Sequence, residues 1–421
     1  MIYFGLLLVF IFEYMRPGSY VPALGILNSI IPLGMFVVSL VVSGKTTNGE
    51  ILRERNTLWL LFFLSLIGIS VLVTAEVRFY AYTRFLQVLG YVFLFFMIVK
   101  LTVDLRRLKL LFATLVFIHV GLVLLNPDLI LKLETRSYLQ GVTFLGDGND
   151  FALSVVIVVP MCLFLLLESK AKWQQLLYLA MLGILLLSVV GTSSRGAAIA
   201  ISAVLLYQWS RSKRKLLGVA ALAVVVAAVL ALAPPSYFER METVKDYETE
   251  SSAQGRLDAW AAAVRMAKDH PLLGVGSGHF GMMYSNQYRP PDYDSDTMKW
   301  LTAHSIYFLT LGELGLPGVA FLFAMILGNL RANGRRMREL DRLPNEARET
   351  QRLLLICLNS SMIAFAVGGA FLSAIYYPHI YVIAGIMTVG GLLHRELLEQ
   401  ASGTAAGAID SEATRELPRV I

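Results

Sequence analysis

Charged residues are scarce in this chain, and their scarcity excludes most classes of protein. Only 16% of the 421 residues are Asp, Glu, Lys or Arg, whereas 56% are hydrophobic and the mean hydropathy is +0.64. An average soluble domain carries about a quarter charged residues. The composition therefore excludes an ordinary soluble domain and predicts a polytopic membrane protein.

Cysteines and processing signals are also few. The two cysteines, Cys162 and Cys357, both fall in apolar stretches. This excludes a disulfide framework and predicts two buried free thiols. The N-terminus has no basic segment followed by a small-residue cleavage site, so we expect the first apolar stretch to remain as an anchor.

What is abundant is apolar sequence in helix-length stretches. A membrane-spanning helix needs about 20 apolar residues, and the shortest spans have about 17. The first stretch is short and is followed closely by Arg16, so we expect it to be tilted or to be half of a broken helix. The sequence thus predicts an all-α polytopic membrane protein of about 12 transmembrane helices, at 1–14, 21–43, 56–74, 82–100, 107–125, 150–168, 174–191, 195–210, 214–233, 303–330, 352–372 and 378–395.

The basic residues predict the orientation of these helices. The net charge of +6 does not indicate a nucleic-acid partner, because most Lys and Arg lie in alternate short loops, as is typical of cytoplasmic loops. We expect both termini to be cytoplasmic and the polar segment 234–302 to be extracytoplasmic. The chain then divides into nine helices (1–233), a large periplasmic loop (234–302), three helices (303–395) and a disordered cytoplasmic tail (396–421).

The long polar segment contains one clear helix. Ser251 or Ser252 can cap it, apolar residues recur at helical spacing to about Asp269, and Pro271 ends it. We expect an amphipathic helix on the outer membrane surface. The GVGSG stretch that follows lacks the Lys and Ser/Thr of a phosphate loop, so we interpret it as a tight glycine turn centred on Gly276.

Two arginines lie where helices are predicted to begin on the outer side. Arg195 follows the potential caps Thr192, Ser193 and Ser194, and Arg256 lies near the start of the amphipathic helix. Unpaired backbone N–H groups, the helix dipole and a planar guanidinium together suit a diphosphate. The alternatives are that Arg195 reaches toward lipid headgroups and that Arg256 is a solvated or salt-bridged charge.

A histidine precedes the tenth predicted helix. We place His304 in the first helical turn, where the dipole disfavours imidazolium and leaves a neutral ring that can accept a proton. Tyr307 lies one turn on. The alternative for His304 is an interfacial side chain bonded to backbone. Glu313 lies about 180° around the helix from His304, so we expect it to have a structural role near a helix break at Gly312, Gly315 or Pro317.

Metal ligands are too few to predict a metal site. His270 and His279 lack companions, and the alternating Asp292, Asp294 and Asp296 lack the rest of a calcium loop. We expect no metal and no cofactor.

Three motifs together resemble a known family. SSRGA at a helix start, GRLDAW followed by PLLGVGSGHF, and AHSIYFLTLGELGLPG are similar to segments of the O-antigen ligase and O-antigen polymerase superfamily. The resemblance covers roughly residues 190–320. The opening stretch FEYMRPGSYVP also resembles ligase-like proteins of polysaccharide-secreting bacteria.

The resemblance implies a metal-independent glycosyltransferase of the GT-C kind in the bacterial inner membrane, with its active site facing the periplasm. The donor would be a glycan on undecaprenyl diphosphate, and the acceptor the lipid A-core sugar. The family's essential residues fall on His304 as the base and on Arg195 and Arg256 as the diphosphate ligands. As further substrate-binding candidates we take Arg84, Arg265, His279, Lys299 and Tyr307, and as structural residues Gly276 and Glu313.

Related chemistries remain open at this point. Polymerases often carry two large outer loops, whereas here only one is long, and this favours a ligase over a polymerase. A protein O-oligosaccharyltransferase would use the same donor. A transporter of lipid-linked sugars would need polar residues deep in several helices, and most of the apolar stretches have none. The oligomeric state is not predicted.

Overall fold

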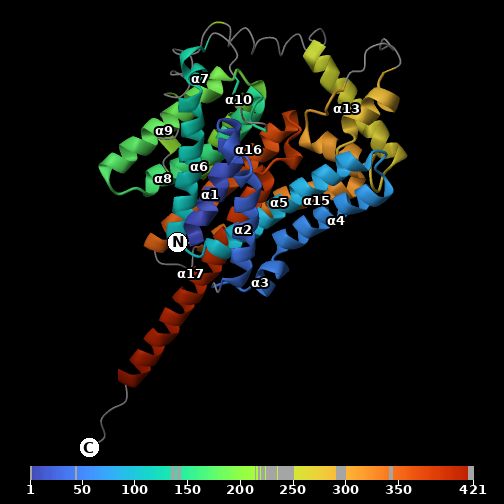
Figure 1. Ribbon diagram of the computed structural model, residues 1–421. Helices are drawn as coiled ribbons and strands as arrows, with labels where there is room; N and C mark the ends of the chain where they lie inside the picture. Colours follow the sequence, from blue (N-terminus) through green and yellow to red (C-terminus); the bar gives the residue numbers. More distant parts are fainter. Residues whose placement is uncertain are drawn as a thin grey trace, which may run out of the picture.

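The computed structural model describes residues 2–42, 45–133, 138–139, 144–213, 251–290, 300–340 and 345–415, with five further positions between 215 and 235. All secondary structure in these residues is helical (Figure 1). The longer helices are α1 Ile2–Tyr14, α2 Leu27–Val41, α4 Arg55–Val73, α5 Arg78–Leu101, α6 Leu105–Leu125, α8 Gly148–Glu168, α9 Lys172–Gly191, α10 Arg195–Arg211, α13 Ser251–Asp269, α15 Ile306–Glu339, α16 Asn345–Gly368 and α17 His379–Arg415.

Short helical elements connect these. They are α3 Asn48–Arg53, α7 Asp128–Leu131, α14 Phe280–Met283, the π-turn Tyr284–Tyr288, and 3₁₀ turns at Pro17–Ser19, Pro22–Leu24, Gly369–Phe371 and Ala374–Tyr376.

Within the described residues, nine helices are long and apolar enough to cross a membrane. Their bounds fall within a few residues of the predicted ones, so the multi-pass helical fold is confirmed. The α1 helix has 13 residues, or about 20 Å, which agrees with the short first element expected. The α10 helix has 17 residues, and the expected stretch 214–233 lies almost entirely outside the described part of the chain.

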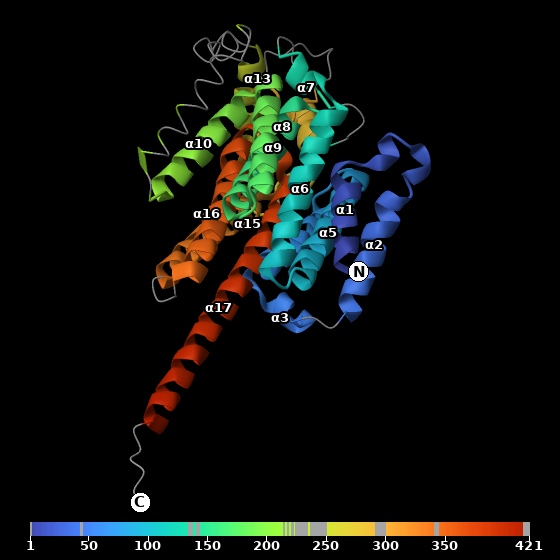
Figure 2. The same cartoon turned by 90° about the vertical axis from the view of Figure 1, so that its left-hand side faces the viewer.

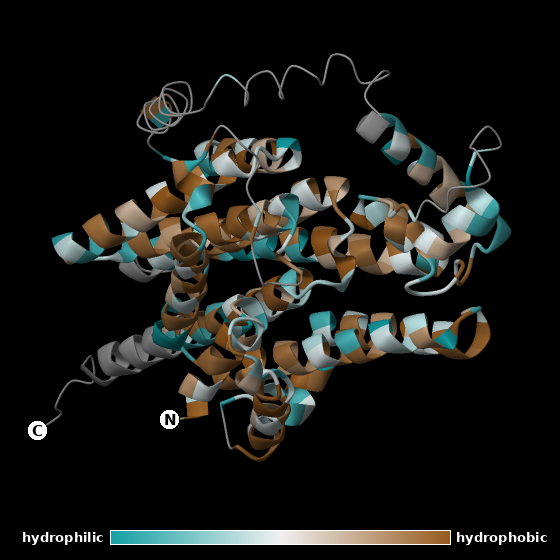
Figure 3. Cartoon of the chain, turned by 45° about the horizontal axis from the view of Figure 1, so that its top comes forward, coloured by the Kyte–Doolittle hydropathy of each residue, from teal (hydrophilic) through white to brown (hydrophobic). Residues whose placement is uncertain are grey.

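Segments predicted to face opposite sides of the membrane lie at opposite ends of the bundle. Figures 1 and 2 both place α7 and α13 at one end, and α3 and the last turns of α17 at the other. Figure 3 shows that the helices between these ends are mostly hydrophobic.

The C-terminal segment differs from the prediction. We expected a disordered tail from residue 396, whereas α17 continues as a helix to Arg415 and projects from the bundle in Figure 1. Ala, Glu, Leu and Arg, which favour helix, are frequent in this stretch, and no proline interrupts it. Residues 416–421 lie outside the described part.

The α8 helix is the centre of the bundle. It packs against α6, α9, α10 and α16, and 78% of its most apolar window is buried. Small and branched side chains, including Ala152, Val155 and Val159, fill the contacts. Because α8 has so little surface left for lipid, its N-terminus is held in place by the helices around it.

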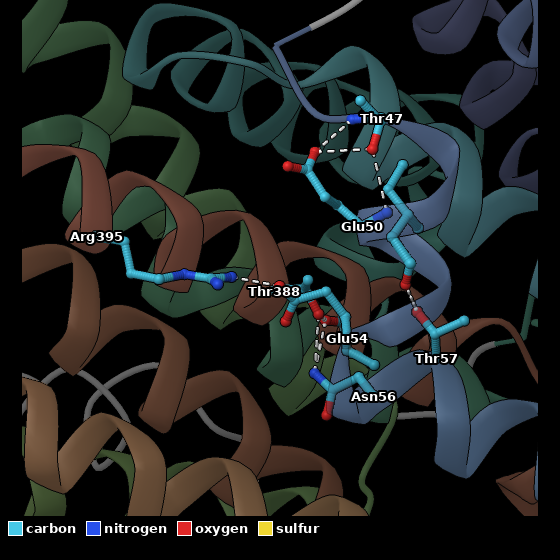
Figure 4. A network of polar contacts seen from close by, with 9 residues as sticks. Thr47, Glu50, Glu54, Asn56, Thr57, Thr388 and Arg395 are labelled. Atoms are coloured by element: carbon cyan, nitrogen blue, oxygen red, sulfur yellow. Dashed lines mark hydrogen bonds and ion pairs between the residues drawn. The ribbon is translucent and has the colours of Figure 1, made fainter.

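Buried polar side chains join the opposite ends of three other helices. Asn56 donates to Asn329 Oδ1 (3.1 Å) and Thr388 Oγ1 (2.9 Å), and Asn329 donates back to Asn56 Oδ1 (3.0 Å). Figure 4 shows this contact beside the ion pair of Glu54 with Arg395. The apolar stretches therefore carry more buried polar groups than we inferred. Each amide pairs with another, so they stabilise α4, α15 and α17 against one another.

The glycine turn fits against a break in α15. Gly315 has φ 64° and ψ −160°, which interrupts the helix at one of the three positions expected. The break exposes backbone carbonyls, so that Val275 N–H donates to Gly312 O (2.9 Å) and Gly276 N–H to Glu313 O (3.1 Å). Gly276 itself has φ +108°, a backbone conformation that favours glycine.

The close approach at this turn generates a stability prediction. A Cβ on Gly274 would lie 2.3 Å from the carbonyl carbon of Glu313, and φ there is +62°. We expect Gly274→Ala to lower the free energy of unfolding by about 2 kcal/mol or more, measured by thermal unfolding in detergent. Gly183→Ala in α9, which meets nothing within 4 Å, is the matched control. Equal stability of the two variants would contradict the docking of the turn.

Candidate active site

His304 lies just before α15, not in its first turn as we predicted. The helix begins at Ile306 with Ser305 as N-cap, and His304 has φ +46°. Its backbone N–H donates to Ser373 Oγ (2.9 Å), and the same oxygen is hydrogen-bonded to the Thr302 hydroxyl (2.6 Å). Because a side chain from a distant segment satisfies this N–H, the chain turns sharply here and His304 is released from the helical register.

Arg256 is brought toward His304 by a tryptophan on the same helix. Trp260 lies one turn after Arg256 in α13, and its Nε1–H donates to the carbonyl of Ala303 (2.8 Å). Its ring also stacks on Phe308, with centroids 4.9 Å apart. These two contacts join α13 to both sides of His304.

Arg195 begins α10, and a short segment connects that end to the start of α15. Gly196 packs so closely on Phe371 that an added Cβ would be 3.1 Å from its Cβ. A Cβ on Gly369 would be 2.7 Å from Ile306 Cδ1. The turn Gly369–Phe371 therefore lies between the first turns of α10 and α15, and brings Arg195 into the same region as His304.

The electrostatic surroundings of His304 favour a neutral ring. Its pKa is lowered below the ordinary value, first by burial and then by the positive charge of Arg256, while the negative charge of Asp147 opposes the shift. We expected the helix dipole to be the cause, but His304 stands outside the helix. A neutral imidazole at pH 7 can accept a proton from a hydroxyl group.

The family comparison agrees with this grouping of residues. The family model described as O-antigen ligase matches residues 180–323. The chain carries an O-antigen ligase domain. The resemblance found in the sequence is thus confirmed, and Arg195, Arg256 and His304 all belong to the ligase domain. A search of the curated proteins found no match.

Asp147 is a residue near the site that the sequence analysis missed. It is the N-cap of α8, where its Oδ1 accepts from Asn149 N–H (2.7 Å). Asp150, in the first turn, accepts from the Tyr377 hydroxyl (3.2 Å). The run Asp-Gly-Asn-Asp directly before an apolar stretch was the available signal, since acidic residues are favoured where helices begin.

Glu313 connects α15 to the glycine turn and to the segment before α17. Its Oε2 accepts from Gly278 N–H (2.9 Å) and the Tyr376 hydroxyl (2.7 Å), and its Oε1 from Phe280 N–H (3.0 Å). The carboxylate therefore binds the preceding loop, whereas we expected it to cap the segment that follows it. Both oxygens serve the fold.

His279 also serves the fold. The side chain is fully buried, its Nε2 accepts from Val77 N–H (3.0 Å), and its Nδ1 lies 2.9 Å from Ser277 O. This pattern requires the proton on Nδ1. With both ring nitrogens bonded to the backbone, neither is left for the substrate contact that we expected.

Two other candidates are bonded to backbone carbonyls. Arg265 donates to Tyr288 O, at the end of the π-turn, and the Tyr307 hydroxyl donates to Ala366 O (2.9 Å) in α16. Both contacts position the elements that surround His304.

The remaining candidates lie apart from these. Arg84 donates to Gln87 Oε1 (2.8 Å), and its guanidinium carbon is 5.1 Å from the Tyr376 ring centroid. Lys299 lies outside the described residues, as do Asp292, Asp294 and Asp296. The described residues contain no group of three or more His, Cys, Asp and Glu that could hold a metal.

The opposing charges around His304 predict how its titration responds to substitution. We expect Arg256→Ala to raise the pKa of His304, because a positive charge is removed, and Asp147→Asn to lower it, because a negative charge is removed. The titration can be followed by NMR of ¹⁵N-histidine-labelled protein, with the His304 signal assigned by difference.

The control for this measurement is Arg265→Ala, which removes an arginine from the same helix. It should leave the pKa of His304 unchanged, because Arg265 is not among the charges that shift it. Asparagine keeps the N-cap of α8, so a loss of the helix end does not complicate the Asp147 variant. A shift in the opposite direction for either variant would contradict the arrangement.

Proposed function

We propose that this protein is an O-antigen ligase. It transfers a polysaccharide from undecaprenyl diphosphate to the lipid A-core oligosaccharide at the periplasmic face of the bacterial inner membrane. The observation that carries the proposal is the placement of His304 and Arg256 together, with the start of α10 joined to the same region, inside the ligase domain. Membrane lipids surround the bundle, and both termini are cytoplasmic.

In this proposal His304 is the general base. A ring kept neutral by burial and by Arg256 accepts the proton of the acceptor hydroxyl as the oxygen attacks the anomeric carbon. The sharp turn at His304 holds the ring at the end of α15. A direct displacement of the diphosphate inverts the configuration of that carbon.

Arg195 and Arg256 bind the diphosphate. Each guanidinium presents a planar set of donors to phosphate oxygens, and the free N–H groups at the start of α10 add to the positive potential. Charge accumulates on the diphosphate as it leaves, so these groups stabilise the transition state more than the ground state. The reaction needs no metal and no other cofactor, and the fold is a GT-C-like bundle of about 12 transmembrane helices.

The first test replaces the proposed base. We expect His304→Asn to reduce kcat by about 10²- to 10⁴-fold, because asparagine adopts a left-handed backbone readily but accepts no proton at neutral pH. Purified protein would receive undecaprenyl-diphosphate glycan and lipid A-core, with chelator and without nucleotide. A shift of the core lipid on a gel measures transfer.

The matched control is His270→Asn, at the exposed end of α13, which should keep full activity. Transfer retained by folded His304→Asn would refute the role of the base, and a need for metal or nucleotide would refute the mechanism. A ladder on the lipid carrier would identify a polymerase, and glycan on a protein acceptor an oligosaccharyltransferase.

Arg195→Lys tests the diphosphate contact separately. Lysine keeps the charge but loses the planar donor fork, so we expect about a tenfold or greater loss of kcat/KM. The decrease would be measured with donor varied at fixed acceptor. Arg211→Lys, at the other end of α10, is the control. Equal kinetics in the two variants would exclude a phosphate-binding role for Arg195.

A further inference from the structure

A cluster of aromatic rings lies where α1 ends and α8 and α17 begin, and the proposed reaction uses none of it. The Phe144 ring lies 5.6 Å from Tyr14, 5.7 Å from Tyr377 and 6.1 Å from His379, centroid to centroid. Phe144 and Tyr14 are buried, whereas Tyr377 is only half-buried. The cluster therefore has a buried floor and one more exposed ring.

Charged groups border this cluster. The Arg16 guanidinium carbon is 5.4 Å from the Phe144 centroid and pairs with Glu13 (3.8 Å). On the other side, Asp150 Oδ2 accepts from the Tyr377 hydroxyl (3.2 Å). One hydrogen bond does not saturate a carboxylate, which offers about four acceptor positions on its two oxygens. Arg16, Asp150 and Tyr377 are all half-buried, so they form the polar edge of the cluster.

Backbone strain sets Arg16 apart as well. Among the described residues, three non-glycine residues have positive φ, namely Arg16 (45°), Ser193 (49°) and His304 (46°). Two of these belong to the proposed catalytic region, since Ser193 lies two residues before Arg195. Strained backbone of this kind is retained at functional sites more often than elsewhere. The turn at Arg16 brings its guanidinium over Phe144, and not along the axis of α1.

The cluster adjoins the proposed active site. Tyr377 lies four residues after Ser373, whose hydroxyl accepts from His304 N–H, and a single 3₁₀ turn separates the two. Asp147, three residues before Asp150, is close enough to raise the pKa of His304. A molecule held against Tyr377 and Asp150 therefore lies beside the proposed base.

One atom of the cluster is left unsatisfied. His379 is 2% exposed, and its Nε2 has no hydrogen-bond partner among the residues that the structure describes. A buried polar atom of this kind ordinarily bonds to a water molecule or a ligand group. A hydroxyl group bound in the cluster is chemically suited to it.

We propose that Arg16, Tyr377 and Asp150, over the Phe144 ring, form a binding subsite for a pyranose ring of one of the two glycan substrates. A sugar has an apolar C–H face, which packs on an aromatic ring, and a rim of hydroxyls, which donate to a carboxylate and accept from a guanidinium. The proposal rests on the function proposed above. The ring belongs either to the donor glycan or to the acceptor core.

Steady-state kinetics test the subsite. In the transfer assay, donor and acceptor would be varied in turn for wild type, Asp150→Asn and Tyr377→Ala. We expect Asp150→Asn and Tyr377→Ala to raise the KM of one glycan about tenfold, with kcat changed less than about twofold. A raised acceptor KM identifies the acceptor ring, and a raised donor KM the donor ring.

Two controls separate this effect from a loss of structure. Asp128→Asn removes an exposed carboxylate from α7, paired only with Lys132 in the printed ion pairs, and should leave both KM values unchanged. Tyr377→Phe keeps the ring but loses the bond to Asp150, so its KM should fall between those of wild type and Tyr377→Ala. Thermal unfolding in detergent checks that each variant is folded.

The two proposals fail in different ways. If wild type transfers no glycan, or folded His304→Asn remains active, the proposed function fails first. If wild type is active and His304→Asn inactive, while folded Asp150→Asn and Tyr377→Ala keep both wild-type KM values, the subsite alone is refuted. A fall in kcat with unchanged KM values would also refute it.

Discussion

One buried carboxylate connects the elements on which the ligase domain depends. Glu313 accepts hydrogen bonds from the glycine turn, from the start of α14 and from Tyr376, so a single side chain of α15 holds the end of α13 and the segment before α17. A hydrogen bond to a charged group contributes about 1.5–3 kcal/mol, and a buried carboxylate without such partners is strongly unfavourable. The three segments are therefore stable together and not separately.

The break of α15 at Gly315 makes this connection possible. A regular helix would use its own carbonyls, but here those of Gly312 and Glu313 accept from the glycine turn. The first turns of α15, which follow His304, are then fixed from below by the loop and from the side by Trp260 of α13. The chemistry proposed for the ligase domain needs such rigidity, because a base must lie within hydrogen-bond reach of the proton that it takes.

How much the sequence predicts depends on the range of the interactions involved. The spans and α13 follow from local rules, since apolar length, a serine cap and Pro271 set their bounds. The family motifs also identify Arg195, Arg256 and His304. By contrast, the backbone of His304 is set by Ser373, 69 residues away, and the bonds of His279 come from Val77. No local pattern contains these partners, so the helix boundary and the role of His279 were misjudged.

The position of His304 also depends on two helices that contain none of the proposed catalytic residues. Its backbone hangs on Ser373, in the short connection between α16 and α17, so a rigid-body shift of either helix displaces the imidazole with it. At their other end these helices are clasped by Gln351, which donates to Gly390 O (3.3 Å), and by Thr388, which accepts from Asn56. Amide side chains at the far side of the bundle thereby govern how steadily a proton acceptor is held near the opposite face.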